Sequence, residues 1–354
     1  MKRKGTHSWR KAGRDSNLLK FAAFLLNYLS RSAILLLLPA CTVSFSGDAP
    51  VRLRVAAASG LPLRSLDVFF FNDDPLRRLD SYQRFDNPSA SVSGASRGGP
   101  KIVVALANSP SDKYSWADIN SYERLMDTMS DYSAEDPGAP VMSGIARVDE
   151  GADRACEIAL KPLLSRIEVA SLSCDFHGRP YEGAVLEDVR IYLTNAGSLC
   201  PVFCGDKVVP GGFLNVGALN GSDMSRLAFP WMLQAEVESP VGAAVRNLGL
   251  TFYCYPNTSE RDGLGTPFTR LVIEGTLLGR RYWYPLDIGR GALGLPEMPQ
   301  GIVRGARYRY DITITRRGAT SPDSPMETGT VRARLLGEDW QEGGNSTILF
   351  RHES

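Results

Sequence analysis

Histidine is scarce in this 354-residue chain, which contains only His7, His177 and His352. A Ser-His-Asp or Cys-His site outside the N-terminal segment would have to use His177 or His352, and neither lies in a recognisable nucleophile motif. No glycine-rich loop opens a helix to hold phosphate. Carboxylates are plentiful, so a glycoside hydrolase is the enzyme class left open, but their spacing selects no pair. The sequence therefore predicts a protein that is not an enzyme, with no catalytic residue and no cofactor.

Cysteine is also sparse, and its arrangement argues against a metal site. After Cys41 the chain has five cysteines, an odd number that cannot all pair: Cys156, Cys174, Cys200, Cys204 and Cys254. Cys200 and Cys204 have roughly the spacing of half a metal site, but no second Cys or His cluster completes it. We predict no bound metal, and either a disulfide or two free thiols at this pair.

The chain lacks an apolar run of the ~20 residues that a membrane-spanning helix needs. Its first forty residues carry eight basic residues, one acid and two shorter apolar stretches, 18–29 and 33–38. A basic start followed by a short apolar run is typical of a secretory signal. Leu38-Pro-Ala-Cys41 then resembles a bacterial lipobox. We predict a signal peptide over residues 1–40 and an acylated Cys41; an N-terminal helix with an incidental cysteine is the alternative.

Neither sign of charge dominates the whole chain, whose net charge is +1. Removal of residues 1–40 would leave 32 basic and 38 acidic residues, a net charge of about −6. A nucleic-acid partner would need a basic face, so this balance argues against one. Two or more acyl chains are needed for firm membrane anchoring, and a lipidated Cys41 (diacylglycerol plus palmitate) would supply them.

Alternation of apolar and polar residues, the pattern of half-buried strands, recurs along the chain. It is clear in residues 51–55, 189–193, 308–314 and 330–335. Residues 68–71 and 102–106 are solidly apolar, which predicts strands covered on both faces. Gly and Pro punctuate nearly every interval, as antiparallel sandwiches require. The sequence thus predicts a mainly β protein.

One helix is expected, and one domain boundary. Ser115 can cap a helix with Asp118 in its first turn, and apolar residues from Ile119 to Met129 form one stripe. This would be a short covering helix in the first domain. Lys161-Pro162 interrupts two predicted strands, and proline cannot continue a central strand. The predicted domains are residues 41–162 and 163–354.

The order of several short phrases resembles the fimbrillins, the lipoprotein-derived subunits of the type V pili of Bacteroidales. The phrases span nearly all of the chain after Cys41: LDVFFFN (66–72), VVALAN (103–108), APVMSG (139–144), LKPLLSRIEV (160–169), YCYPN (253–257), LVIEG (271–275), RYWYPL (281–286), and residues 307–315 and 331–340. Pro39 in the lipobox is a departure from the usual pattern.

The resemblance implies two transthyretin-like antiparallel β-sandwich domains in tandem and assembly by strand exchange. In that family a protease cuts after an arginine beyond the first strand, and a strand of another subunit fills the vacated groove. Here the first strand would be residues 51–58, with Val51, Leu53 and Val55 pointing inward, and Arg64 would be the cut site. An ordinary loop arginine is the alternative for Arg64.

A short apolar segment near the C-terminus is the candidate donor strand. Thr347, Ile348, Leu349 and Phe350 follow a Gly-Gly pair that could act as a hinge. The same segment could equally be the last strand of its own domain. Exchange of this kind is β-augmentation, in which an added strand pairs an open sheet edge.

The predicted function is that of a structural, tip or anchor subunit of a fimbria at the outer membrane, used in adhesion. Its partners would be other fimbrial subunits, the outer membrane through the lipid anchor, and surface glycans or proteins. A surface glycan-binding lipoprotein with β-sandwich modules is the alternative. Phe229-Pro-Trp231 and Tyr282-Trp-Tyr284 could stack on sugars in that case, although such clusters are usually core in β proteins.

Overall fold

The computed structural model describes residues 49–57, 60–150, 154–205, 207–216, 227–290, 301–324, 326, 329–339 and 348–350. The chain divides into two units, residues 1–46 and 47–354, and all of these residues belong to the second. The predicted signal peptide, Cys41 and Thr347 lie outside the described residues. Within the described ranges, no helix is long and apolar enough to cross a membrane.

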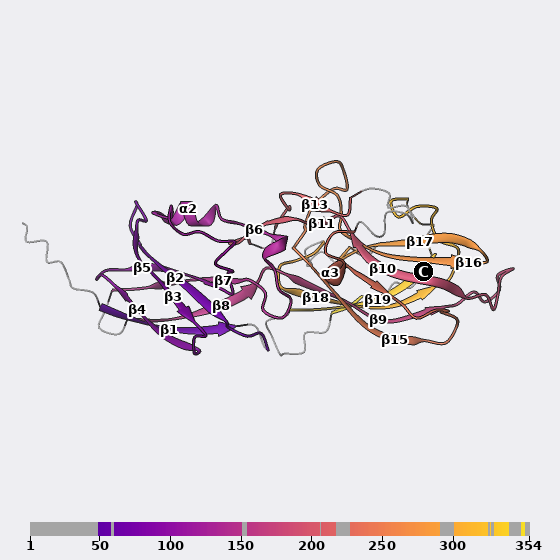
Figure 1. Cartoon of the computed structure of the whole chain (residues 1–354), viewed down its shortest axis with the longest axis horizontal. Coiled ribbons are helices and arrows are strands. Elements are labelled where there is room, and N and C mark those ends of the chain that lie inside the picture. The colour runs from indigo at the N-terminus through magenta and orange to yellow at the C-terminus, as the bar shows by residue number, and fades with distance from the viewer. Residues whose placement is uncertain are drawn as a thin grey trace, which may run out of the picture. The chain divides into compact units, whose positions relative to one another are not determined.

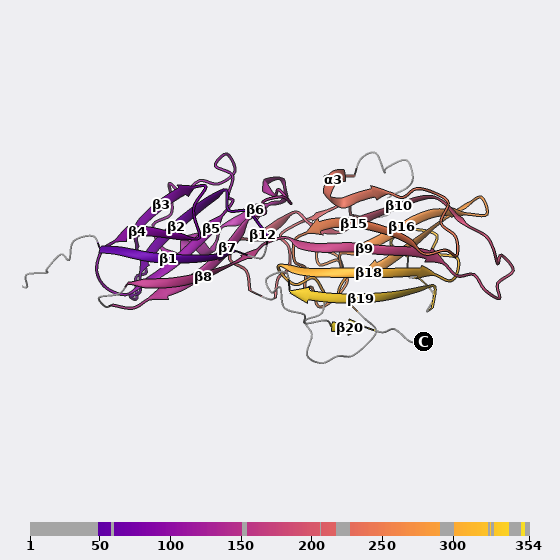
Figure 2. The same cartoon turned by 90° about the horizontal axis from the view of Figure 1, so that it is seen from below.

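The first strands along the chain form one seven-stranded sheet, coloured indigo to magenta in Figures 1 and 2. In spatial order its strands are β3 (Leu79–Asp86), β2 (Ser65–Asn72), β5 (Lys101–Ala107), β7 (Met142–Val148), β8 (Ala155–Pro162), β1 (Ala49–Ala57) and β4 (Ser91–Ser96). The sheet folds over on itself, since Gly94 of β4 lies directly against the Phe70 ring of β2. Apolar side chains of β1, β2, β5, β7 and β8 fill the space enclosed.

The later strands form two sheets around a second core. One sheet has the order β14 (Gln234–Glu236), β10 (Leu186–Thr194), β16 (Arg270–Leu277), β17 (Arg280–Asp287). The other has the order β15 (Arg246–Cys254), β9 (Ser165–Cys174), β18 (Ala306–Ile314), β19 (Val331–Asp339), β20 (Ile348–Phe350). Apolar residues of β10 and β16 pack in one cluster with those of β9 and β18, so the two sheets face each other as a sandwich.

Two short pairs complete the strands. β11 (Ala196–Gly197) pairs with β13 (Phe213–Leu214), and β12 (Leu199–Pro201) pairs with β6 (Met129–Asp131). The second pair joins a segment that precedes β7 to one that follows β10. The predicted fold class, mainly β with two sandwiches in tandem, is confirmed.

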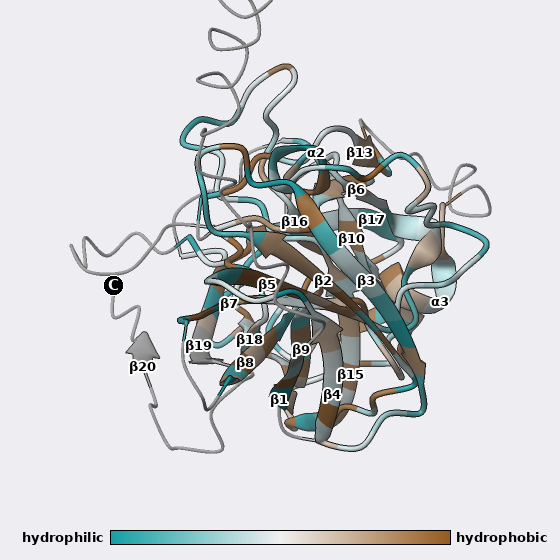
Figure 3. Ribbon diagram, turned by 90° about the vertical axis from the view of Figure 1, so that its left-hand side faces the viewer, coloured by the Kyte–Doolittle hydropathy of each residue, from teal (hydrophilic) through white to brown (hydrophobic). Residues whose placement is uncertain are grey.

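The strand patterns follow the sequence closely. Every second residue of β18, from Tyr308 to Ile314, is buried, and β5 is buried throughout. Strands such as β2 and β5 carry the hydrophobic colour in Figure 3. Two pairs depart from the antiparallel expectation, because β1 runs parallel to β8 and β9 runs parallel to β18. Parallel neighbours need a long crossover, and in both pairs several other strands lie between the two partners in the chain.

The covering helix starts later than the sequence predicts. Helix α2 spans Tyr122–Met126 and is capped by Ser121, so the prediction of a cap at Ser115 is wrong. The residues around Ser121 pair with an earlier segment, because Leu79 donates a backbone hydrogen bond to Asn120 and Tyr122 donates one to Arg77. Because its N–H is used in this way, Tyr122 cannot bond the carbonyl four residues earlier, as a helix beginning near Ser115 would require. A 3-10 turn, η2 (Tyr132–Ala134), and a second short helix, α3 (Pro230–Leu233), complete the elements.

Candidate strand-exchange site

β1 lies inside its sheet, between β4 and β8, and is not an edge strand (Figure 2). It pairs antiparallel with β4 from Ala49 to Arg54 and parallel with β8 from Arg52 to Ala57. Both of its backbone edges are therefore hydrogen-bonded over most of its length. Loss of β1 would leave a slot with unpaired backbone groups on two walls, the geometry that β-augmentation requires.

The predicted inward side chains of β1 are buried as expected. Val51, Leu53 and Val55 are 0%, 1% and 3% exposed and belong to the first core cluster, whereas Arg52 and Arg54 are exposed. Burial of each aliphatic side chain is worth about 1.5–3 kcal/mol. A strand that replaced β1 would need apolar residues at the same alternate positions.

Arg64 lies directly before β2, with an exposed side chain and a hydrogen-bonded backbone. Its guanidinium forms an ion pair of 2.7 Å with Asp136 while the side chain stays 60% exposed. Its backbone N–H donates to Asn108 Oδ1 at 2.8 Å, and its carbonyl accepts from Asn87 N–H at 2.8 Å. A protease could contact the side chain, but it could cut the bond after Arg64 only when these backbone bonds open.

Asn108 fixes the segment that precedes Arg64. This buried residue adopts a φ of +59°, and its side-chain amide donates to the carbonyls of Pro62 and Pro140, both at 3.0 Å. One side chain thus holds the connection after β1 against the loop before β7. In the sequence, Asn108 stands out only as the last residue of the VVALAN motif.

β20 is held more weakly than β1. It lies at the edge of the five-stranded sheet and pairs with β19 at three positions, from Gly337↔Ile348 to Leu335↔Phe350. This pairing is the arrangement of a last strand in its own sheet. A three-residue edge strand has few backbone bonds to lose, so the same segment is suited to leave the sheet.

A buried carboxyl, Glu135, is a feature that the sequence does not reveal. Its Oε1 accepts hydrogen bonds from Tyr255 Oη at 3.0 Å and Ser130 Oγ at 3.4 Å, and its Oε2 accepts one from Val141 N–H at 3.1 Å. Burial raises the pKa of Glu135 to about 7. Because Tyr255 follows β15, this carboxyl links the β6–β7 segment to the second sandwich.

Arg304 makes a second buried link between the two halves. It is 6% exposed, and its guanidinium donates to Pro162 O at 3.2 Å, Ser143 Oγ at 2.8 Å and Cys204 O at 3.1 Å. A guanidinium cannot lose its proton in a protein and has several donors to satisfy. These acceptors therefore fix the ends of β7 and β8 against residues that follow β12.

The five cysteines after Cys41 are all free thiols, so the free-thiol alternative holds for Cys200 and Cys204. A hydrogen bond with the Cys200 thiol lowers the pKa of Cys204, and the positive charge of Arg304 contributes. In the described part of the chain, no group of three or more His, Cys, Asp or Glu residues is placed to hold a metal.

The two aromatic groups differ in exposure. Tyr282 and Tyr284 are buried in the second core, so the structure assigns that group to packing. Trp231 is 73% exposed, and its ring makes an edge contact with Phe229, which makes another with the buried ring of Tyr132. Trp231 is therefore the side chain of these groups that a ligand could reach.

His177 lies on the surface beside a carboxylate. It is exposed, and its ring contacts Glu182 at 3.0 Å. Among the described residues, the polar partner of its ring is this carboxylate. His352 lies outside the described residues.

The fold is that of tandem β-sandwiches. Several solved structures have a similar fold. A proposed cell adhesion protein from Parabacteroides distasonis has a TM-score of 0.63 at 15% identity, over 85% of this chain and 99% of that one. One from Bacteroides eggerthii has a TM-score of 0.63 at 15% identity, over 83% and 97%. A fimbrilin from Porphyromonas gingivalis has a TM-score of 0.61 at 13% identity, over 84% and 98%.

At these identities the similarity concerns the fold, and it confirms the fimbrillin fold that the sequence resemblance implies. No protein-family model matches the sequence, and no curated protein matches it. The three proteins are a fimbrial subunit and two proposed adhesion proteins, and none is described as an enzyme. This agrees with the prediction that the chain is not an enzyme.

Proposed function

We propose that this chain is a non-enzymatic fimbrial subunit of the fimbrillin family, exported as a lipoprotein and assembled by strand exchange. The observation that carries the proposal is the position of β1, an apolar first strand that fills an inner place in its sheet. Residues 1–40 would be the signal peptide, and residues 41–162 and 163–354 the two domains. β8 ends at Pro162 and β9 begins at Ser165 in a different sheet, which supports this division.

Assembly would proceed in three steps. Acylated Cys41 would hold the chain in the outer membrane, and cleavage after Arg64 would release β1 with the segment before it. The C-terminal strand of another subunit, residues 347–350, would then fill the slot. The exposed side chain of Arg64 supports the choice of cut site, and the weak pairing of β20 supports its role as donor.

The N-terminus of the mature protein tests this route. Mass spectrometry of the protein from outer membranes should find an acylated peptide starting at Cys41 in the unassembled form and a peptide starting at Ser65 in fimbriae. Cys41→Ala should leave the chain in the inner membrane or release it to the periplasm. Normal surface display of this variant, with no lipid on the wild type, would contradict the lipoprotein proposal. A fimbrial form that still starts at Cys41 would contradict cleavage, as for a tip or anchor subunit that keeps β1.

A glycan-binding surface lipoprotein is the second candidate, and the exposure of Trp231 favours it. Indole rings stack on the apolar faces of sugars. Binding of a defined oligosaccharide by the monomer, lost in Trp231→Ala, would support this function. Absence of binding across a glycan array would leave the fimbrial role.

A further inference from the structure

Within the seven-stranded sheet, β4 relies on β1 for all of its backbone pairing with other strands. It lies at the end of the sheet, and β1 is its only neighbour there among the described strands. If β1 leaves, as the proposed function requires, β4 loses every strand partner at once. A slot with two walls can persist only if other contacts keep β4 in place.

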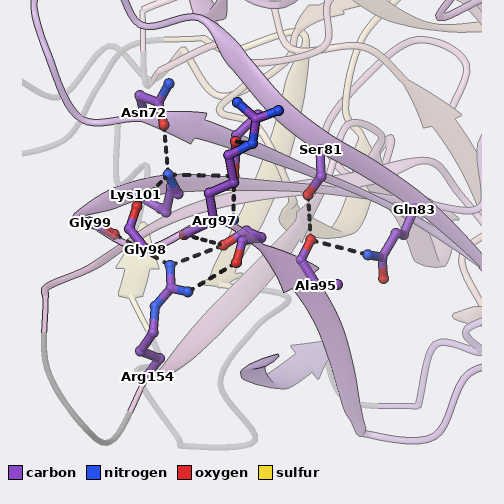
Figure 4. A network of polar contacts seen from close by, with 11 residues as sticks. Asn72, Ser81, Gln83, Ala95, Arg97, Gly98, Gly99, Lys101 and Arg154 are labelled. Carbon is purple, nitrogen blue, oxygen red and sulfur yellow. Dashed lines mark hydrogen bonds and ion pairs between the residues drawn. The ribbon is translucent and has the colours of Figure 1, made fainter. Parts of the chain in front are cut away.

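Contacts from β3 and β2 hold the middle of β4. Ser81 Oγ and Gln83 Nε2 of β3 both donate to the carbonyl of Ala95, at 2.6 and 3.2 Å (Figure 4). Gly94 packs so closely on Phe70 that an added Cβ would lie 2.4 Å from the ring's Cζ atom. Neither contact involves β1, so both can survive its departure.

Arg154 connects the two walls of the slot directly. It precedes β8, is 8% exposed, and occupies the same alternation as the buried Ile158 and Leu160, so its side chain lies on the interior side of the sheet. Its guanidinium donates to Ser96 O at 3.2 Å, Ser96 Oγ at 3.0 Å and Gly99 O at 3.3 Å. It therefore reaches from the β8 side to the end of β4, past the start of β1.

The turn between β4 and β5, to which Arg154 donates, is held by further polar contacts. Lys101, which is 1% exposed, donates from Nζ to Asn72 Oδ1 at 2.6 Å and to Gly98 O at 3.2 Å. Asp80 of β3 pairs with Lys101 at 3.4 Å and accepts from Arg97 N–H at 2.8 Å. Figure 4 shows this network and the Arg154 contacts converging on the turn between β4 and β5. These side-chain contacts tie the end of β4 to β2, β3, β5 and the start of β8 and do not pass through β1, although the Arg154 carbonyl also accepts from the N–H of Arg52 in β1.

We propose that Arg154 is a positioning residue for strand exchange, which keeps β4 and β8 apart at the correct spacing while the slot is empty. The inference rests on the proposed function. A slot that is already formed accepts a donor strand without first having to order β4. If only a fraction of the molecules have an ordered slot, the apparent affinity for the donor falls by that fraction.

The test uses the mature chain with a specific protease site inserted after Gly60. Leu53→Ala in the same chain weakens the resident strand, so that after cleavage a labelled peptide of native sequence 49–58 can replace it. Fluorescence anisotropy gives the rate of peptide capture. Arg154→Met should capture the peptide about tenfold more slowly, as expected if the competent slot falls to about a tenth of its population. Arg124→Met is the matched control, because this exposed arginine on helix α2 lies outside the contacts that hold β4 and should leave the rate unchanged.

Each outcome bears on one claim. If the cleaved parent chain, in which Arg154 is unchanged, captures no peptide, the result counts against the slot and so against the proposed function. Capture at the same rate by the parent and by Arg154→Met would overturn the role of Arg154 alone. An equal loss of melting temperature in uncut and cut Arg154→Met, with an unchanged capture rate, would show that the residue is only structural. Should Arg154→Met not fold, Ser96→Ala removes one acceptor and should still slow capture measurably.

Discussion

β1 and β20 are the first and last strands described, and they are held in contrasting ways. β1 pairs on both edges and buries Val51, Leu53 and Val55, whereas β20 pairs on one edge at three positions. β1 cannot leave without opening a core, and β20 can leave at little cost. In a chain that exchanges strands, the first property makes an acceptor slot and the second makes a donor.

The largest expected effect comes from a charge placed in the slot. Leu53→Asp should lower the free energy of unfolding by about 4 kcal/mol, because the buried position offers no partner to a carboxylate. Arg52→Ser, on the exposed face of the same strand, should change it by less than about 0.5 kcal/mol. Urea unfolding of both variants measures the difference. Equal losses in the two variants would show that the inward face of β1 is not what holds the strand.

The free energy of unfolding should also depend on pH, through the buried carboxyl of Glu135, which lies in neither β1 nor β20. Burial raises the pKa of Glu135 from its ordinary 4.5 to about 7, so the folded chain binds this proton more tightly than the unfolded chain does. The resulting stability is complete below about pH 4.5 and is lost as the pH rises through about 7, a change of about 3 kcal/mol. Glu135→Gln, which mimics the protonated acid, should reduce this loss.

Unfolding free energies at pH 5 and pH 8 test this expectation. Glu123→Gln, on the exposed part of α2, is the control and should keep the wild-type pH dependence. A wild-type slope retained in Glu135→Gln would show that another group causes it.

Removal of β20 should have a small effect on folding and a large one on assembly. Deletion of residues 347–354 should lower the unfolding free energy by about 1 kcal/mol, because few backbone hydrogen bonds are lost. The same deletion should abolish polymerisation if this segment is the donor. Polymers of normal length from the deleted chain, detected by gel electrophoresis without heating, would remove β20 from the assembly route.

The smallest effects are expected at surface side chains far from both strands. Trp231→Ala and His177→Ala should each change stability by less than about 0.5–1 kcal/mol, since both side chains are largely exposed. Fimbrial assembly by either variant should be normal. Loss of a reproducible hydrolytic activity in His177→Ala combined with His352→Ala would contradict the non-enzymatic proposal.

The local features of the fold could be predicted from the sequence because they depend on neighbours in the chain. The alternation of apolar and polar residues in β1 and β18 correctly predicted which faces of these strands are buried. The apolar runs of β2 and β5 correctly predicted strands that are covered on both sides. The helix start was wrong because Asn120 and Tyr122 pair with residues some forty positions earlier. Helix caps follow local sequence only when no distant strand competes for the backbone.

The polar residues that organise the site could not be predicted. Arg154, Glu135 and Arg304 each make side-chain contacts with residues between 58 and 161 positions away, or bind a backbone group that the fold brings near. A charged residue in a sequence is usually exposed, so its burial becomes apparent only when its acceptors are placed. The parallel pairing of β1 with β8 was missed for the same reason.

The most direct test of the account is whether the slot of β1 accepts the C-terminal strand. The chain is cut after Arg64, freed of its N-terminal segment by mild urea, and returned to buffer with a peptide of residues 344–354 or 49–58. The account predicts that both peptides raise the melting temperature, and that Leu349→Asp in the first peptide abolishes its effect. Stabilisation by the 49–58 peptide alone would show a real slot that the C-terminus does not fill. No stabilisation by either peptide would contradict the central claim.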